Sequence, residues 1–148
     1  GDNVFTGYWE MPEKTAESFR DDGFFITGDM AREDEDGYIT IVGRDKDLII
    51  SGGLNIYPKE IESLIDAHHG VTESAVIGVP HPDFGEGVVA ILVADDNVTA
   101  DAVMAGISDK LAKFKQPKKI LFVDALPRNT MGKVQKAVMR KEHEKMFS

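Results

Sequence analysis

The sequence predicts an α+β fold in which a small domain over residues 45–148 follows a β-rich piece over residues 1–44. Three observations carry this prediction. Stretches typical of strands and helices alternate from residue 58 onward, as in a mixed sheet flanked by helices. Residues 1–44 are instead rich in aromatic residues, glycine and aspartate. The composition changes near residues 44–47, and we place the domain boundary there.

The N-terminal piece is expected to contain one short helix and short strands joined by acidic turns. Met11–Arg20 has helical character, with Pro12 in the first turn, where a missing N–H is tolerated. Asp-Gly dipeptides at 22–23 and 36–37 are turn signals. The strands expected around these turns and just beyond the boundary are Phe24–Thr27, Tyr38–Val42 and Asp47–Ser51. A flexible loop at Gly52-Gly53 follows them.

Residues 58–146 show the change of period that marks a helix-containing domain. Pro58 is expected to open a helix that Gly70 ends. Thr99 is expected to cap a second helix that runs to Pro117, and residues 132–146 a terminal helix with a basic face. The apolar stripes of the first two helices are Ile61, Leu64, Ile65 and His68, and Val103, Ile107, Leu111 and Phe114. The buried strands are Ser74–Val79, Val88–Ala94 and Ile120–Val123.

The composition excludes several classes of function. Hydrophobic residues make up 42% of the 148, enough for a buried core. The absence of cysteine excludes disulfides, thiolate catalysis and cysteine-ligated metals, and the four histidines lack metal-ligand spacing, so no metal site is expected. No apolar run reaches the roughly 18 residues of a membrane helix and no leader is visible, so we expect no membrane partner and a cytoplasmic setting. Because there is no initiator Met, we expect a piece of a longer protein.

The charge is uneven along the chain. The net charge is −9, yet residues 111–148 carry ten basic and three acidic residues. A solvated helix face is one explanation, and a site for a polyanion such as a nucleotide or a coenzyme phosphate is the other. Nucleic acid is not expected as a partner, because the acidic remainder of the surface would repel it.

Two glycine motifs fit nucleotide-binding patterns and fail their structural requirements. Gly85–Ala90 fits G-x-G-x-x-A, but it opens a β-rich run where a dinucleotide fingerprint must open a helix. Gly132-Lys133 lacks the earlier glycine of a P-loop, where Pro127 stands, and Val134 replaces the magnesium-binding Ser/Thr. The stretch before Lys133 is a poor helix former, so this lysine is expected on a loop or at a helix start. There it is able to stabilise a developing oxyanion, while an ordinary surface lysine is the simpler interpretation.

Two charged residues follow expected strands or turns. Asp29 comes after Thr27-Gly28, where an exposed carboxylate is able to bind sugar hydroxyls, and Arg44 comes after Gly43. A turn cap or a surface ion pair explains each residue as well, so both interpretations stay open on local grounds.

Taken in order, these motifs resemble those of the acyl-adenylate-forming enzymes, a superfamily of acyl-CoA synthetases, peptide-synthetase adenylation domains and luciferases. The resemblance extends over nearly the whole chain. The residues that carry it are Thr27-Gly28-Asp29, Gly37-Tyr38, Gly43-Arg44, Gly52-Gly53, Glu60-Ile61-Glu62 and Pro127 through Gly132-Lys133. The stretches most similar to malonyl-CoA synthetases are Asn55–Glu60, Val79–Gly87 and Pro127–Lys136.

The resemblance implies the small C-terminal α+β domain of this superfamily over residues 45–148, preceded by the end of the large N-terminal domain. It implies an ATP-dependent, AMP-forming acid–CoA ligase that uses ATP, Mg²⁺ and coenzyme A on a small carboxylic acid, with malonate the preferred choice. The alternatives are another acid (acetate, an aromatic acid or a fatty acid), a non-catalytic binding or scaffold module, and a self-contained anion-binding domain. Because the phosphate loop, the adenine pocket and the acid pocket belong to the large domain, this chain alone is expected to be inactive.

Roles in the first half-reaction are implied for four residues. Asp29 would bind the ribose hydroxyls, and Arg44 would lie beside the nucleotide. Lys46 would be the hinge between the two domains. Lys133 would be the catalytic lysine that enters the site for adenylation only.

Roles in the second half-reaction are implied for the glycine loop and the basic segment. Gly52 and Gly53 would line the pantetheine tunnel after rotation about the hinge. Lys115, together with Lys118 and Lys119, would meet the phosphates of coenzyme A. A lysine acetyltransferase acting on Lys133 is a further implied partner, because related acyl-CoA synthetases are acetylated at the matching lysine.

Overall fold

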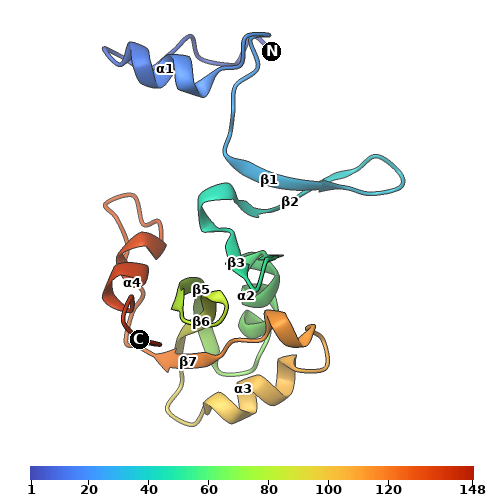
Figure 1. Cartoon of the computed structure of the whole chain (residues 1–148), viewed down its shortest axis with the longest axis vertical. Helices are drawn as coiled ribbons and strands as arrows, with labels where there is room; N and C mark the ends of the chain where they lie inside the picture. The colour runs from blue at the N-terminus through green and yellow to red at the C-terminus, as the bar shows by residue number, and fades with distance from the viewer.

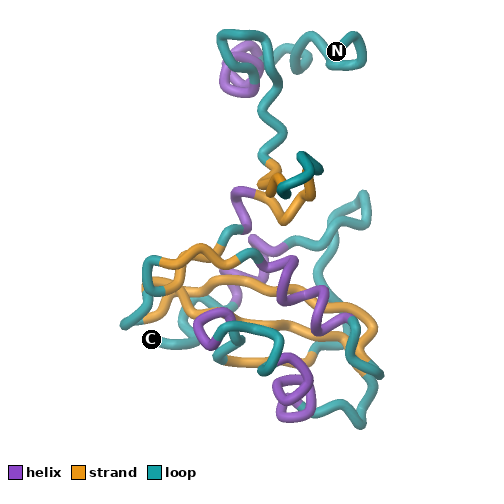
Figure 2. Tube along the Cα trace, turned by 90° about the vertical axis from the view of Figure 1, so that its right-hand side faces the viewer, coloured by secondary structure: helices purple, strands orange, loops and turns teal.

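The computed structural model describes residues 1–148 and arranges them in three parts (Figure 1). An N-terminal part containing helix α1, Pro12–Ser18, lies at one end of the molecule. An extended segment leads from it to a hairpin of β1, Asp29–Glu33, and β2, Ile39–Arg44. A layered domain begins at β3, Ile49–Ser51, and contains the rest of the chain. Figure 2 shows the extended segment separating the N-terminal part from the hairpin and the domain.

The N-terminal part is held by an aromatic cluster rather than by a sheet. The rings of Phe5, Tyr8, Phe19 and Phe25 lie with centroids 5.0–5.7 Å apart in edge-on or tilted pairs. The strand expected at Phe24–Thr27 is wrong, because only a single bridge between Phe19 and Phe25 forms there. The helix expected at Met11–Arg20 is confirmed, one residue shorter at its start and two at its end.

The β1–β2 hairpin contains a strand that the sequence did not predict. Asp29–Glu33 carries few β-forming side chains, and it becomes a strand by pairing antiparallel with β2, from Asp29 opposite Arg44 to Glu33 opposite Ile39. The turn between them is closed by Asp34, whose Oδ1 accepts hydrogen bonds from the amides of Asp36 and Tyr38 at 3.0 and 2.9 Å. The register places the charged ends of the hairpin, Asp29 and Arg44, side by side.

The domain is built on a five-stranded mixed sheet. Its strands are β3, β4 (Leu54–Ile56), β5 (Val71–His81), β6 (Gly85–Ala94) and β7 (Lys119–Phe122). They are arranged in the order β4-β3-β6-β5, and β7 pairs with β6 in parallel while the other pairs are antiparallel. The predicted mixed sheet flanked by helices is confirmed.

Helices cover both faces of this sheet, and this explains why β5 and β6 are apolar at consecutive positions. Helices α2, Pro58–Asp66, and α3, Ala100–Ile107, pack on one face, where Ile61, Ile65, Val76 and Ile107 share a core. Helix α4, Lys136–Glu142, packs on the other face through Met139, against the β5 residue Ile77. The alternation of Val76 and Ile77 between the two cores is the period-two pattern of a strand.

Three helix and loop predictions need correction. Helix α3 ends at Ile107 instead of reaching Pro117, because the Gln116 side chain donates hydrogen bonds to the carbonyls of Ser108 and Leu111 and closes a loop there. Phe114 consequently lies in a short 3₁₀ turn, Lys113–Lys115, and is 42% exposed. Helix α4 begins at Lys136 instead of residue 132. The predicted cap is confirmed, since Thr99 Oγ1 accepts a hydrogen bond from the Ala102 amide at 3.2 Å.

The Gly52-Gly53 segment is a tight two-residue turn and not the expected flexible loop. It joins β3 to β4, and φ is +59° at Gly52 and +79° at Gly53, a conformation that residues with a Cβ adopt only with strain. The Gly52 amide also donates a 2.8 Å hydrogen bond to the Phe84 carbonyl. The turn is therefore fixed against the β5–β6 connection.

Candidate active site

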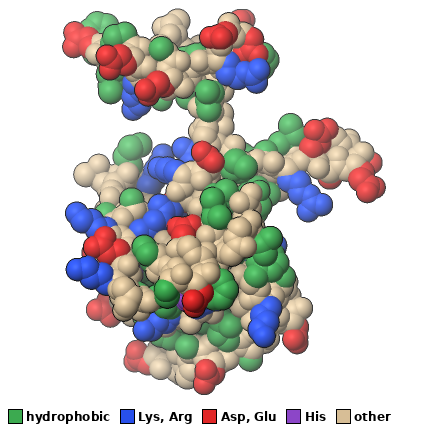
Figure 3. All heavy atoms as spheres, in the orientation of Figure 1, with side chains coloured by type: hydrophobic (Ala, Val, Ile, Leu, Met, Phe, Trp, Pro, Cys, Tyr) green, Lys and Arg blue, Asp and Glu red, His purple; other side chains and the backbone are tan.

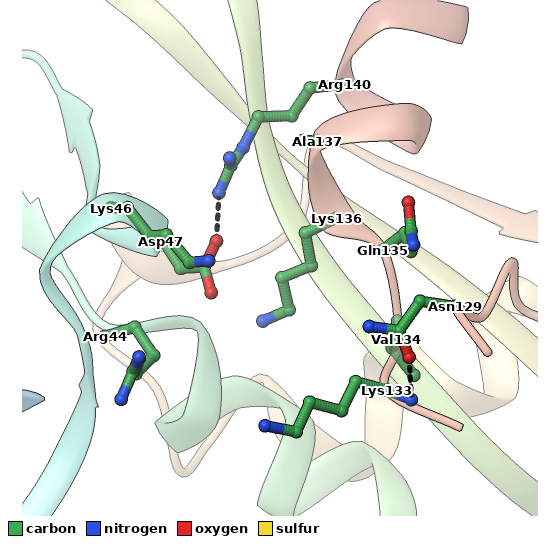
Figure 4. Close-up of a pocket in the computed structure, with 10 residues that line it drawn as sticks. All are labelled: Arg44, Lys46, Asp47, Asn129, Lys133, Val134, Gln135, Lys136, Ala137 and Arg140. Atoms are coloured by element: carbon green, nitrogen blue, oxygen red, sulfur yellow. Dashed lines mark hydrogen bonds and ion pairs between the residues drawn. The ribbon is translucent and has the colours of Figure 1, made fainter. Parts of the chain in front are cut away.

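A cleft of about 530 Å³ lies where the end of the hairpin meets the start of helix α4 (Figure 4). Five of its side chains are cationic and one is a carboxylate. Figure 3 shows Lys and Arg side chains gathered on one side of the domain, below the segment that leads to the N-terminal part. The residues that line the cleft are Arg44, Lys46, Asp47, Asn129, Lys133, Val134, Gln135, Lys136, Ala137 and Arg140. This excess of positive charge favours a polyanionic ligand.

Lys133 stands on a closed loop at the rim of this cleft. The Asn129 amide donates to the Lys133 carbonyl at 2.9 Å, and the Gly132 amide donates to the Asn129 carbonyl at the same distance. Gly132 has φ +76°, which allows the chain to reverse before Lys133. The prediction that Lys133 lies on a loop or at a helix start is confirmed, because α4 begins three residues later.

The ammonium group of Lys133 has no ion-pair partner in the chain. Its side chain is exposed, and Figure 4 shows it extending toward the segment that carries Arg44. Lys46 likewise forms no ion pair. Two cations are thus free to meet a ligand, whereas the other three cations of the cleft have partners.

Lys136 and Arg140 attach helix α4 to the rest of the domain. Lys136 Nζ lies 2.5 Å from Oε1 of Glu62, which is 7% exposed and also accepts a 2.8 Å hydrogen bond from the Val76 amide. Arg140 Nη2 lies 2.6 Å from Oδ1 of Asp47. The sequence analysis missed both pairs. Their i, i+4 spacing places Lys136 and Arg140 on one helix face and was the only local signal.

Asp29 and Arg44 form the ion pair that one interpretation of the sequence allowed. Arg44 Nη1 lies 2.5 Å from Asp29 Oδ1, across the hairpin. Arg44 lines the cleft and Asp29 does not. The Asp29 side chain keeps 26% of its surface exposed, so its second oxygen is open to a further donor.

Lys46 is the one residue between two tethered neighbours. The Asp45 amide donates a 3.0 Å hydrogen bond to the Gly28 carbonyl, which belongs to the hairpin side. The Asp47 side chain is bound to Arg140 of α4, which belongs to the domain side. Lys46 therefore lies at the junction between the hairpin and the domain.

The other predicted site residues lie outside the cleft. Lys115 Nζ lies 2.7 and 2.8 Å from the two carboxylate oxygens of Glu60. Together they line a second cavity of about 620 Å³ between the hairpin and α2. Gly52 contacts Phe84, and Lys118 Nζ lies 3.9 Å from the centroid of the Phe84 ring. The structure therefore brings Lys118, and not Lys115, to the vicinity of the glycine turn.

No group of three or more His, Asp or Glu side chains that could hold a metal ion is present in residues 1–148. Likewise, none of the helices has the length and apolar character needed to cross a membrane.

Residues 60–133, half of the chain, match the family described as AMP-binding enzyme C-terminal domain. The chain belongs to this family. The chain is 46% identical over 143 residues to the long-chain-fatty-acid–CoA ligase FadD13 of Mycobacterium tuberculosis. This match covers 96% of the chain and 28% of the relative. It is 40% identical over 155 residues to the malonate–CoA ligase of Arabidopsis thaliana, covering 96% of the chain and 26% of the relative.

Among solved structures, the whole chain is similar to MatB from Rhodopseudomonas palustris, with 62% identity over 100% of the chain and 30% of MatB. The TM-score is 0.90 against the ATP-bound crystal structure and 0.74 against the apo crystal structure of the same enzyme. The chain therefore spans less than a third of the length of these relatives. The identity is the same in both comparisons, and the chain matches the ATP-bound structure more closely than the apo structure.

Proposed function

We propose that this chain is the C-terminal portion of an ATP-dependent, AMP-forming acid–CoA ligase. In this proposal residues 1–44 are the end of the large domain and residues 45–148 are the mobile small domain. The observation that carries the proposal is Lys133, an unpaired lysine on a closed loop at the rim of a cationic cleft. That cleft occurs in a chain whose TM-score is higher against ATP-bound MatB, at 0.90, than against apo MatB, at 0.74.

The chemistry assigned to Lys133 is electrostatic. When a carboxylate attacks the α-phosphate of ATP, negative charge builds on the oxygens between them, and pyrophosphate leaves. An ammonium group held in advance near these oxygens stabilises that charge without a reorganisation cost. Lys133 is therefore the catalytic residue of the adenylation step in this proposal.

ATP itself fits the charge of the cleft. Arg44 and Lys46 line the cleft and offer donors to phosphate oxygens, and the exposed oxygen of Asp29 is an acceptor for sugar hydroxyls. This chain contains no cluster of three or more His, Asp or Glu side chains that could form a magnesium site. We therefore assign Mg²⁺ to residues of the large domain and derive no step through it.

Coenzyme A is assigned to the state that follows rotation about the hinge, in which the Gly52-Gly53 turn replaces Lys133 at the site. The Gly52-Gly53 turn lacks side chains, so a thin pantetheine arm is able to approach its backbone closely. Lys118 beside Phe84 is better placed than Lys115 to meet phosphates near this turn, because Lys115 is engaged by Glu60. Lys46, between its two tethered neighbours, is the proposed hinge that exchanges Lys133 for the glycine turn.

Malonate is the acid that we propose. MatB, at 62% identity, and a malonate–CoA ligase, at 40%, support malonate. A fatty-acid ligase at 46% shows that identity in this segment does not rank acids. The acid pocket belongs to the large domain, so the choice of acid requires the full-length protein.

The test of the catalytic assignment separates the two half-reactions in the full-length protein. Lys133→Ala should lower ATP–pyrophosphate exchange by about 10²–10³-fold, the cost of losing one preorganised donor. Thioester formation from a synthetic acyl-adenylate and coenzyme A should be unchanged. The matched control is Lys141→Ala, an exposed lysine of α4 outside the cleft. Equal losses in both half-reactions would contradict the assignment.

The test of the acid supplies ATP, Mg²⁺ and coenzyme A with malonate, methylmalonate, acetate, benzoate or a fatty acid, and identifies the thioester by mass spectrometry. A dominant malonyl thioester is expected. A different dominant thioester would keep the mechanism and replace the acid. If none of the acids yields a thioester or an adenylate, the result would favour a non-catalytic module instead.

We also propose that a lysine acetyltransferase acts on Lys133. The neighbouring Met131 is 76% exposed, so the loop is accessible to an enzyme in this arrangement. Acetylation would remove the positive charge that adenylation requires. Incubation with acetyl-CoA and a cognate acetyltransferase should modify Lys133, with Lys133→Arg as the control in peptide mass spectrometry, and an unmodified Lys133 would contradict this proposal.

A further inference from the structure

We propose that Asn129 and Arg128 are positioning residues that hold the Lys133 loop in its catalytic conformation. This inference rests on the proposed role of Lys133 in adenylation. Neither residue needs to touch a substrate for this role, because each acts on the backbone from which Lys133 extends.

Asn129 closes the loop with its side chain. Its Oδ1 accepts hydrogen bonds from the Met131 amide at 3.0 Å and from the Lys133 amide at 2.9 Å. The backbone of Asn129 makes two more bonds, donating to the Lys133 carbonyl and accepting from the Gly132 amide. One residue therefore makes four of the hydrogen bonds that fix the path of the chain up to Lys133.

Arg128 connects the same loop to the sheet. Its Nη1 donates to the Gly132 carbonyl at 2.7 Å, and its Nη2 forms an ion pair with Glu73 of strand β5. The planar guanidinium presents both donors in a fixed geometry, which a lysine cannot reproduce. The loop is thus attached to strand β5 at two points. One is Arg128 itself, directly before Asn129, and the other is Gly132, directly before Lys133.

These contacts are directed to the loop and not to the core of the domain. The Arg128 side chain is 45% exposed and the Glu73 side chain is 29% exposed, and an exposed ion pair of this kind adds little to stability. The loop is also outside both hydrophobic cores except at Val134. The consequence of these bonds is therefore the placement of Lys133, and misplacement of a catalytic group by about 1 Å costs about 10²-fold in rate.

The experiment measures both half-reactions in the full-length protein that contains this segment. Asn129→Ala and Arg128→Ala should each lower ATP–pyrophosphate exchange by about 10- to 100-fold, with the rate constant falling more than the Michaelis constants change. Thioester formation from a supplied acyl-adenylate should be unchanged, which also shows that each variant is folded. Asn129→Ser, which keeps a weaker acceptor, should recover most of the exchange rate.

Two controls make the outcomes distinct. Asn97→Ala makes the same chemical change at an exposed turn between β6 and α3 and should alter neither half-reaction. Lys133→Ala in the same background tests the proposed function itself: if it keeps the exchange rate, the proposed function fails. If Lys133→Ala loses the exchange rate while Asn129→Ala and Arg128→Ala keep it, only the positioning proposal is overturned.

A second measurement reads the loop directly. Asn129→Ala should speed hydrogen exchange of the Met131 and Lys133 amides, the two donors that lose their acceptor, and leave the β5 amides unchanged. The positioning role would be overturned if hydrogen exchange at the Met131 and Lys133 amides were unchanged in Asn129→Ala. It would also be overturned if the variants lost both half-reactions equally.

Discussion

Residues 1–48 and residues 49–148 differ in where their apolar side chains lie. All 18 buried hydrophobic residues belong to the second region, from Ile49 to Met139. The first region contains no buried residue, although it holds 9 of the 16 large hydrophobic residues that are exposed. Those nine are Val4, Phe5, Trp9, Met11, Phe24, Ile26, Tyr38, Ile39 and Ile41. One region therefore folds around its own core, and the other presents apolar surface outward.

This contrast indicates that the first region completes its packing against something outside the chain. Trp9 at 87% and Ile39 at 71% are more exposed than large apolar residues usually are, and exposed apolar side chains in this number indicate interaction surface. The large domain that precedes this segment in the proposed enzyme is the partner that we infer.

Hydrogen exchange on this chain should give the largest difference. Amides of residues 58–146 that are bonded in the sheet and helices should exchange at least about 10³-fold more slowly than those of residues 1–44, because only the former open by unfolding a core. Mass spectrometry of peptides after timed exchange measures this directly. Uniform protection across the chain would show that residues 1–44 are stable on their own.

Two isoleucine truncations compare the regions by stability. Ile77→Ala, at a fully buried position of strand β5, should lower the free energy of unfolding of this chain by about 2–5 kcal/mol. Ile39→Ala, in the exposed strand β2, should change it by less than about 0.5 kcal/mol. Urea unfolding followed by circular dichroism provides both values, and similar losses for the two variants would contradict the difference in burial.

The success of the sequence predictions follows the same division. The strands β5 and β6 and the start of helix α2 were predictable, because burial on two faces or one face imposes a pattern on consecutive residues such as Val76 and Ile77. The expected end of α2 at Gly70 was wrong, since the helix ends at Asp66. Strand β1 was not, because Asp29–Glu33 becomes a strand only through its pairing with β2. The false strand at Phe24–Thr27 has β-forming residues, and they pack in an aromatic cluster instead.

The candidate site shows the same limit. The order of the motifs singled out Arg44, Lys46 and Lys133, and the structure places all three around one cleft. Lys115 was assigned to coenzyme A because it belongs to the basic segment 111–148. Its ion pair with Glu60 joins residues 55 positions apart, and no local pattern reveals such a contact. The anchors Lys136 and Arg140 were missed for the same reason, since Glu62 and Asp47 lie 74 and 93 positions away.

Ion pairs provide a third comparison. The Asp47–Arg140 pair has side chains 18% and 27% exposed, and a double-mutant cycle to alanine should give a coupling energy of about 1–2 kcal/mol. The Arg20–Asp22 pair of the first region has side chains 65% and 47% exposed and should give less than about 0.5 kcal/mol. Unfolding free energies of the four variants in each cycle measure the couplings, and equal values would remove the distinction.

A helix cap tests a single hydrogen bond of the second region. Thr99→Ala should destabilise the chain by about 1 kcal/mol, because the Ala102 amide loses its acceptor at the start of α3. Thr99→Ser keeps the hydroxyl and serves as the control in the same urea titration. A loss as large in Thr99→Ser as in Thr99→Ala would show that the cap bond does not stabilise the helix.

In the proposed function the β1–β2 hairpin and the layered domain rotate about Lys46, and one interspin distance reports this rotation. This chain has no cysteine, so the full-length protein, with any native cysteine replaced, can carry spin labels at Thr40→Cys of the hairpin and Ser63→Cys of α2. A control pair at Ser63→Cys and Asn97→Cys lies within the domain. Pulsed electron paramagnetic resonance should show the first distance shifting between the ATP-bound state and the state with acyl-adenylate and coenzyme A, while the control distance stays constant. An unchanged first distance in the two states would contradict the hinge and the exchange of Lys133 for the glycine turn.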